Sequence, residues 1–321
     1  MSRFLLFAFW IILSLSQFAK AAERPNILFI FTDDQSYRTV SCYPEAYPWV
    51  KTPNIDALAA QGVRFTHTYL GTWCMPSRAT MLTGHHQYGV ESMRMQGEYP
   101  GSVYDPDKCP FWPKVFRQHG YTTAQIGKWH TGIDSGYGRD WDHQIVWSRP
   151  KYPQNAGHYY DDQIVEIDGK VKRISGYTTD WYTDRAEDFI RGKHRQANQP
   201  WYLWLCFGAV HGPFTPAERH QTAYPDAEVP EPVNIYPGES RKGKPEYVRN
   251  RNRWQRNEKG NAELDSGVQQ RTVVNAPIHG NTLQNWVRQY HQGVLAIDDA
   301  VGQLRKALEE SGQAKNTLIV F

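Results

Sequence analysis

The hydrophobic and polar positions along the chain follow two patterns, which together predict an α/β protein. Continuous apolar runs rich in β-branched and aromatic residues are typical of strands buried on both faces of a parallel sheet. Such runs occupy residues 25–32, 121–126, 201–210 and 315–321. Residues 63–70 alternate between apolar and polar side chains and predict one further strand. A chain of 321 residues is long enough to bury one large α/β core.

Helices are predicted where apolar residues recur at helical spacing between capping signals. Residues 52–62 begin with a threonine and a proline and end with a glycine, which is the usual order of helix start and stop signals. Residues 283–312 carry the longest such pattern, and a glycine ends it. Shorter helices are predicted over residues 111–119 and 179–192.

Two stretches lack a clear period. Residues 131–180 are rich in Gly, Asp, Tyr and Trp, and they predict loops and short strands around the mouth of a pocket. Residues 221–280 turn polar, with many Pro, Asn and Arg residues. They predict an irregular insertion on the core domain.

The first 22 residues predict a secretory signal peptide. Arg3 precedes an apolar run over residues 4–18, and the Ala-Lys-Ala sequence at residues 19–21 fits signal peptidase. The apolar run is too short for a membrane span. We therefore expect a secreted or periplasmic protein whose mature chain starts near Ala22 and has no stable membrane anchor.

Charge and cysteine content narrow the classes of function. Lys and Arg number 36 against 33 Asp and Glu, so the overall charge gives no indication of nucleic-acid binding. The cysteines are Cys42, Cys74, Cys109 and Cys206. Cys206 lies in an apolar run and is predicted to be buried, whereas pairing of Cys42 with Cys109 stays open. A thiol redox protein would need a second cysteine near Cys74, and the sequence has none there.

Two adjacent carboxylates, Asp33 and Asp34, follow the first predicted strand. The carboxyl end of a central strand is where α/β sheets place their sites. Neighbouring side chains on a strand point in opposite directions, so both can bind one ligand only if the backbone has left the strand. Two hard oxygen ligands indicate Ca²⁺ or Mg²⁺. The alternative is a turn or a helix cap.

Cys74 begins a segment over residues 74–84 that predicts a helix with Pro76 in its first turn. A thiol at a helix start faces free backbone N–H groups and the positive end of the helix dipole, which suits a group that binds or carries an anion. Arg78 lies within one helical turn of Cys74, so its guanidinium can reach the same place. The alternative is a buried cysteine at a helix start.

Basic residues follow two of the later strands. Lys128 and His130 come directly after the strand over residues 121–126. In an extended backbone they share one face, so both can reach one pocket. The alternative is a solvated strand end. His211 follows the strand over residues 201–210, and on its own this signal is weak.

These segments resemble one known family. Cys-x-Pro-Ser-Arg followed by Ala-Thr-Met-Leu-Thr-Gly, over residues 74–84, closely resembles the signature of the formylglycine-dependent (type I) sulfatases, a branch of the alkaline-phosphatase-like superfamily. Gly-Lys-Trp-His at residues 127–130, His-x-Pro at residues 211–213 and the pair Asp33-Asp34 are similar to family segments. The resemblance implies an alkaline-phosphatase-like sandwich with a large mixed, mostly parallel central sheet flanked by helices.

The resemblance also implies the chemistry of a sulfuric ester hydrolase. In the family, a maturase oxidises the cysteine of the motif to Cα-formylglycine, so Cys74 would be converted and Pro76 and Arg78 would be recognised. The hydrate of this aldehyde attacks sulfur with one hydroxyl, and the other then collapses to the aldehyde and expels sulfate. Asp33, Asp34 and residue 74 would bind Ca²⁺ or Mg²⁺.

The remaining roles rest on the resemblance together with the chemistry of each side chain. Arg78 and Lys128 would add positive charge for the anion in the transition state. His130 would act as the base for the collapse, and His211 would donate a proton to the leaving alcohol.

The substrate would be a sulfated small molecule or glycan, and we favour a carbohydrate sulfate. Trp129, Trp141 and Trp147 are expected near the pocket and would suit sugar rings, although cores and loops use tryptophan equally well. A basic run over residues 241–256 is either a solvated loop or a surface on which a polyanionic sulfated glycan docks.

The resemblance covers residues 23–321 and implies the N-terminal part of a sulfatase catalytic domain. In the family, the strand over residues 315–321 leads into an acidic-polar pair that completes the metal site, a lysine follows, and a small subdomain ends the chain. We therefore expect a fragment truncated before the end of the catalytic domain, with the C-terminal subdomain absent. Two alternatives stay open: a formylglycine-dependent phosphonate or phosphodiester hydrolase, and a non-catalytic relative that binds sulfated glycans.

Overall fold

The computed structural model describes residues 24–321, except residues 88–89, 91–106, 108, 237–240, 250–253 and 266–279. The predicted signal peptide over residues 1–22 lies outside the described residues. Within the described part of the chain, no helix has both the length and the apolar character needed to cross a membrane.

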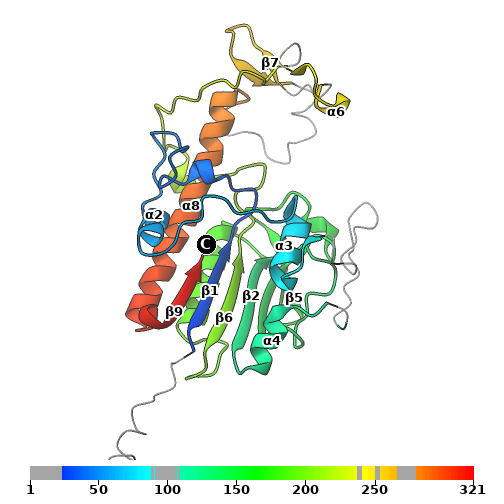
Figure 1. Ribbon diagram of the computed structural model, residues 1–321, viewed down its shortest axis with the longest axis vertical. Helices are drawn as coiled ribbons and strands as arrows, with labels where there is room; N and C mark the ends of the chain where they lie inside the picture. Colours follow the sequence, from blue (N-terminus) through cyan, green and yellow to red (C-terminus); the bar gives the residue numbers. More distant parts are fainter. Residues whose placement is uncertain are drawn as a thin grey trace, which may run out of the picture.

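Seven strands of the described chain form one central sheet (Figure 1). Their order across the sheet is β5-β4-β3-β2-β6-β1-β9. Neighbours from β3 to β9 are parallel, whereas β4 is antiparallel to both β3 and β5. The predicted mixed, mostly parallel sheet flanked by helices is therefore confirmed. The strands are β1 (Asn26–Phe31), β2 (Thr122–Lys128), β3 (His143–Trp147), β4 (Gln163–Ile167), β5 (Lys170–Ile174), β6 (Trp201–Cys206) and β9 (Thr317–Val320).

Helices cover both faces of this sheet. Successive side chains of a strand point to opposite faces, so Leu28 and Ile30 pack in one hydrophobic cluster and Phe29 in the other. The first cluster includes side chains of α5 (Thr178–Ile190) and α8 (Leu283–Glu310). The second includes side chains of α3 (Cys74–Thr83) and α4 (Trp112–Gln118). Because both faces are covered, the central strands are continuous apolar runs.

The predicted helices over residues 52–62, 111–119, 179–192 and 283–312 are confirmed. They correspond to α2 (Pro53–Ala60), α4, α5 and α8. In α8, Thr282 caps the amino end by accepting a hydrogen bond from the Asn285 amide through its side chain.

The predicted strand over residues 63–70 is wrong, and so is the burial predicted for the last strand. Val63 and Tyr69 are exposed, and this segment pairs with no strand of the described chain. Both sides of β1 are already occupied by β6 and β9, which leaves no neighbouring edge for it. Among the described strands β9 lies at one end of the sheet, and Leu318 is 54% exposed.

The three tryptophans predicted beside the pocket belong to the core. Trp129, Trp141 and Trp147 are at most 1% exposed. Trp141 stacks on Trp204 at 6.1 Å between ring centroids. The suggestion that these rings contact a sugar is therefore wrong.

The four cysteines are unpaired, so Cys42 and Cys109 form no disulfide. Cys206 is fully buried, as predicted.

The described residues of the predicted insertion form short elements, namely α6 (Glu246–Arg249), β7 (Trp254–Arg256) and β8 (Ala262–Leu264). Figure 1 shows β7 near the amino end of α8, away from the central sheet. Arg241 of the basic run donates to the carbonyl of Ile235 at 2.8 Å, so it holds the backbone of this region. Residues 250–253 of the run lie outside the described residues.

Candidate active site

The predicted site residues meet at one edge of the sheet. Asp33 and Asp34 follow β1, Lys128 ends β2, and His211 lies in the loop after β6. Since these three strands are parallel, their carboxyl ends lie at the same edge, where α/β sheets place their sites. The amino end of α3 brings Cys74 to the same edge.

Asp33 is the centre of a buried ion-pair group. Lys128 Nζ donates to Asp33 Oδ2, and Arg78 Nη2 lies 3.6 Å from Asp33 Oδ1. The three side chains are at most 3% exposed. Burial alone would raise the pKa of Asp33, but the charges of Lys128 and Arg78 lower it to about 2. One carboxylate thus faces two cations, and the group keeps a net positive charge.

Arg78 retains donors for a further ligand. Its Nη1 donates to the Lys128 carbonyl at 2.9 Å, and its Cζ lies 5.1 Å from the ring centroid of Phe31. Its Nε and Nη2 atoms are buried and have no hydrogen-bond partner among the described residues. Nη2 already faces Asp33, and the side chain also contacts the Cys206 thiol. Buried donors normally find an acceptor, so Nε is the donor that fits an anionic ligand.

Cys74 is the first residue of α3, directly after Trp73. Gly84 ends this helix in the left-handed conformation with φ 71°. The ligand atoms of Cys74, Asp33 and His211 lie within 4.8 Å of one another. Burial raises the pKa of the Cys74 thiol, and Lys128 only partly opposes this. An unmodified thiol here is mostly protonated at neutral pH and is a weak nucleophile.

The two adjacent carboxylates reach the same place because the backbone turns between them. Asp34 has φ 56°, so the chain has left the strand. Its Oδ2 lies 3.7 Å from His211 Nε2. Tyr290 of α8 holds this turn by donating to the Asp34 carbonyl and accepting from the Ser36 amide, both at 2.7 Å. Asp33, Cys74 and His211 offer ligand atoms close enough for one divalent cation, and Asp34 adjoins this group at His211.

His130 lies at the site, but not for the predicted reason. β2 ends at Lys128, and His130 has φ 59°, so the backbone between them is not extended. The buried His130 ring lies edge-on to Trp73, and its Nδ1 has no hydrogen-bond partner among the described residues. Burial and the charges of Lys128 and Arg78 lower the pKa of His130 to about 3, which keeps the imidazole neutral.

Gly127 brings β2 close to β6 just before Lys128. Its φ is 104°, and a Cβ at this position would lie 2.0 Å from the Cys206 carbonyl oxygen. Only glycine can adopt this φ while its backbone lies this close to β6, so Gly127 fixes the position of the backbone at Lys128.

His211 is held by two tyrosines that the sequence did not reveal. Its ring stacks on Tyr159 at 3.9 Å and 6° between planes, and its carbonyl accepts from the Tyr160 hydroxyl at 2.6 Å. Its Nδ1 lies 2.8 Å from the Gly212 carbonyl. Burial and Lys128 lower the pKa of His211. Tyr159 and Tyr160 lie in a loop without any period or motif, so no sequence signal marks them.

The family model for sulfatases matches residues 25–321. The chain belongs to the sulfatase family. Among its relatives, the N-acetylglucosamine-6-O-sulfatase of Bacteroides thetaiotaomicron is 31% identical over an alignment of 339 residues, which covers 93% of this chain and 57% of that protein. The arylsulfatase of Klebsiella aerogenes is 26% identical over 94% of this chain and 66% of its own length. The chain thus spans about three fifths of the length of these sulfatases.

Solved structures share the fold of this sulfatase chain. The complex of BT4656 with its substrate D-glucosamine-2-N,6-O-disulfate superposes with a TM-score of 0.67 at 27% identity, over 92% of this chain and 64% of that one. The phosphonate monoester hydrolase of Agrobacterium radiobacter superposes with a TM-score of 0.55 at 21% identity, over 92% of this chain and 61% of that one. The latter likeness concerns the fold alone.

A cavity of about 790 Å³ opens beside the sulfatase motif. Asp33, Asp34 and Cys74 line one part of it, and Trp73 lies at its wall. Trp73 is 44% exposed, in contrast to the buried tryptophans of the core. An exposed indole next to residue 74 is suited to contact the ring of a bound sugar.

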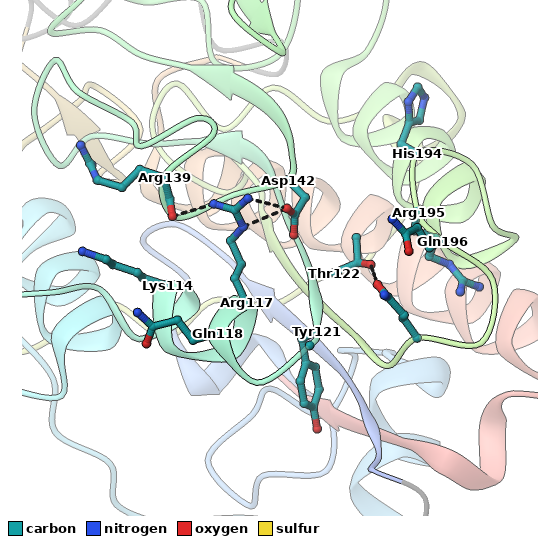
Figure 2. Close-up of a pocket in the computed structure, with 12 residues that line it drawn as sticks. Lys114, Arg117, Gln118, Tyr121, Thr122, Arg139, Asp142, His194, Arg195 and Gln196 are labelled. Carbon is teal, nitrogen blue, oxygen red and sulfur yellow. Dashed lines mark hydrogen bonds and ion pairs between the residues drawn. The ribbon is translucent and has the colours of Figure 1, made fainter.

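Another cavity, of about 660 Å³, lies at the opposite ends of β2 and β3 (Figure 2). Its arginines are engaged within the protein. Arg117 pairs with Asp142 at 2.8 Å and donates to the Arg139 carbonyl at 2.7 Å, and Arg195 donates to the Ile190 carbonyl. This cavity is separate from the edge that holds the sulfatase motif.

Proposed function

We propose that this chain carries the catalytic centre of a sulfatase that hydrolyses a sulfate ester on a carbohydrate. The observation that carries the proposal is the positive group around residue 74, where the buried side chains of Lys128 and Arg78 share the single carboxylate of Asp33. Preorganised cations of this kind stabilise the charge that develops on sulfate oxygens. The relatives that act on glucosamine sulfates support a carbohydrate substrate.

We infer that a maturase converts Cys74 to formylglycine. The motif over residues 74–84 and the place of Cys74 at the helix start support this step. The raised pKa of the thiol supports it too, because an unmodified cysteine would be a poor nucleophile here. The formylglycine would supply the hydroxyl that attacks sulfur.

We further propose that Asp33, Asp34 and residue 74 hold a divalent cation, Ca²⁺ or Mg²⁺. Such an ion lowers the pKa of a bound hydroxyl and offsets charge on the sulfate. Lys128 and Arg78 would then share their donors between Asp33 and the sulfate oxygens. Nε of Arg78, which has no hydrogen-bond partner among the described residues, supports this assignment.

The two histidines differ in what they can do with a proton. His130 is neutral and its Nδ1 has no partner among the described residues, so a ring nitrogen is free to accept a hydrogen bond from a hydroxyl at residue 74; with a pKa of about 3 it is a weak base for the proton itself. A carbonyl can only accept, so His211 Nδ1 donates to Gly212, and Nε2 carries a proton only in the imidazolium. Burial and Lys128 lower the pKa of His211, and Asp34 beside Nε2 offsets part of this effect; the imidazolium form would protonate the leaving alcohol.

We propose that the mature protein is secreted or periplasmic, because residues 1–22 have the basic start, apolar run and small-residue exit of a signal peptide.

The reaction class is tested by comparing kcat/KM on esters of matched leaving groups. We expect the matured chain to hydrolyse an aryl sulfate faster than the phosphodiester or phosphonate of the same aryl group, and to hydrolyse N-acetylglucosamine 6-O-sulfate as well. A higher kcat/KM on the phosphorus esters would favour the alternative hydrolase. Binding of sulfated sugars without any turnover would favour the non-catalytic alternative.

A further inference from the structure

Arg149 lies beside the site but belongs to none of the sulfatase motifs. It follows β3 by two residues and is partly buried. Its Nη1 donates to the Tyr159 hydroxyl at 2.8 Å. The Tyr159 ring stacks on His211, and its centroid lies 5.1 Å from Lys128 Nζ and 5.8 Å from Arg149 Cζ. One phenol ring therefore connects Arg149 to two residues of the site.

Arg149 lacks the counter-charge that Lys128 and Arg78 have. Asp33 faces both Lys128 and Arg78. Among the described residues, no carboxylate lies within ion-pair distance of Arg149, and its buried Nε has no hydrogen-bond partner. A buried donor on a charged group is costly unless an acceptor arrives. Arg149 therefore adds a positive charge without a counter-charge beside Tyr159 and Lys128.

A purely structural role explains only part of this arrangement. If Arg149 served only to hold Tyr159 under His211, the Nη1 hydrogen bond would suffice, and a neutral donor could supply it. This role does not explain why a charged side chain without a counter-charge lies here. Arginine presents several donors in a fixed fork, which matches the oxygens of sulfate and carboxylate groups.

We propose that Arg149 forms a subsite for a second anionic group, a sulfate or a carboxylate, on the sugar that carries the ester sulfate. The proposal rests on the proposed function, because it takes the ester sulfate to lie at Lys128 and Arg78. The substrate class is then a sugar with two anionic substituents. The enzyme prefers it over a singly sulfated sugar.

Binding to the chain with an unconverted Cys74 thiol tests the subsite without turnover. Calorimetry would compare N-acetylglucosamine 6-O-sulfate, which has one anionic group, with glucosamine-2-N,6-O-disulfate, which has two. A 2-O-sulfated uronic acid distinguishes a carboxylate from a sulfate as the second group. The readout is the ratio of Kd values for the singly and doubly anionic sugars, which cancels any general loss of folded protein.

Arg149→Gln is expected to lower this ratio about tenfold, the usual size of one charge-assisted contact. Arg149→Lys should keep part of the preference. Tyr159→Phe removes the hydrogen bond but leaves the cation, so the ratio should stay close to that of the parent chain. Arg117→Gln alters a cation of the remote cavity in Figure 2 and serves as the matched control.

Two results would overturn the subsite. One is an unchanged ratio in Arg149→Gln; the other is the same loss in Arg149→Gln and Tyr159→Phe, which would limit Arg149 to positioning Tyr159. Turnover of the singly sulfated sugar by the matured parent chain reports on the proposed function separately. If that turnover is present and the ratio does not depend on Arg149, the function stands and the subsite fails.

Discussion

Replacing Cys74 by alanine is expected to lower kcat for a carbohydrate sulfate by about four orders of magnitude or more, because the change removes the nucleophile. Cys74 is the residue at which the carboxylate of Asp33, the imidazole of His211 and the amino end of α3 converge. The measurement is the steady-state rate of sulfate release by parent and variant chains matured in the same host.

The matched control is Cys42→Ala. Cys42 is also half-buried and unpaired, and it lines the same cavity. Burial raises the pKa of its thiol too. It is not one of the site residues, so the variant should retain parental turnover. Full turnover by Cys74→Ala would refute the assignment of the nucleophile.

Replacing Asp33 by asparagine is expected to destabilise the fold by about 3–5 kcal/mol, because it leaves two buried cations without a counter-charge. Arg78 and Lys128 are at most 1% exposed, so water cannot take the place of the carboxylate. The free energy of unfolding would be measured by chemical denaturation in the presence of a chelator, so that loss of a bound metal does not contribute.

The control for this change is Asp34→Asn. The Asp34 side chain is 52% exposed, so removing its charge should cost less than about 1 kcal/mol. Similar losses in the two variants would contradict the buried ion-pair group.

The effect of Asp33→Asn should also depend on pH. The pKa of Asp33 falls from 3.8 to about 2 on folding, so its stabilisation is complete above pH 3.8 and is lost as the pH falls toward 2. The difference between parent and variant should therefore shrink over that interval.

Much of the sheet and of the helical layers could be predicted from the sequence. Central strands such as β1 and β6 are buried on both faces, so their apolar runs are unbroken. Helices such as α8 carry a wide apolar stripe between clear end signals. Residues 63–70 alternate between apolar and polar side chains, as a half-buried strand does, so the prediction of a strand was wrong for a reason that lies outside the segment. Both sides of β1 are already paired, and a local pattern carries no information about that.

Site residues that belong to a sequence motif could be predicted. Site residues that only the packing of distant segments brings together could not. Asp33, Cys74 and Lys128 lie in short segments with recognisable composition. Tyr159 and Tyr290 reach the site from a loop and from the face of α8, and only the packing of distant segments brings them there. The φ of 59° at His130 was equally hidden, because alternation assumes an extended backbone.

The most direct test of the account is the mass of the tryptic peptide over residues 65–78 from protein secreted by a host with an active maturase. The account predicts the mass of an aldehyde at position 74. An unmodified thiol there, in cells that convert a control sulfatase, would contradict formylglycine chemistry and favour a non-catalytic relative that binds sulfated glycans.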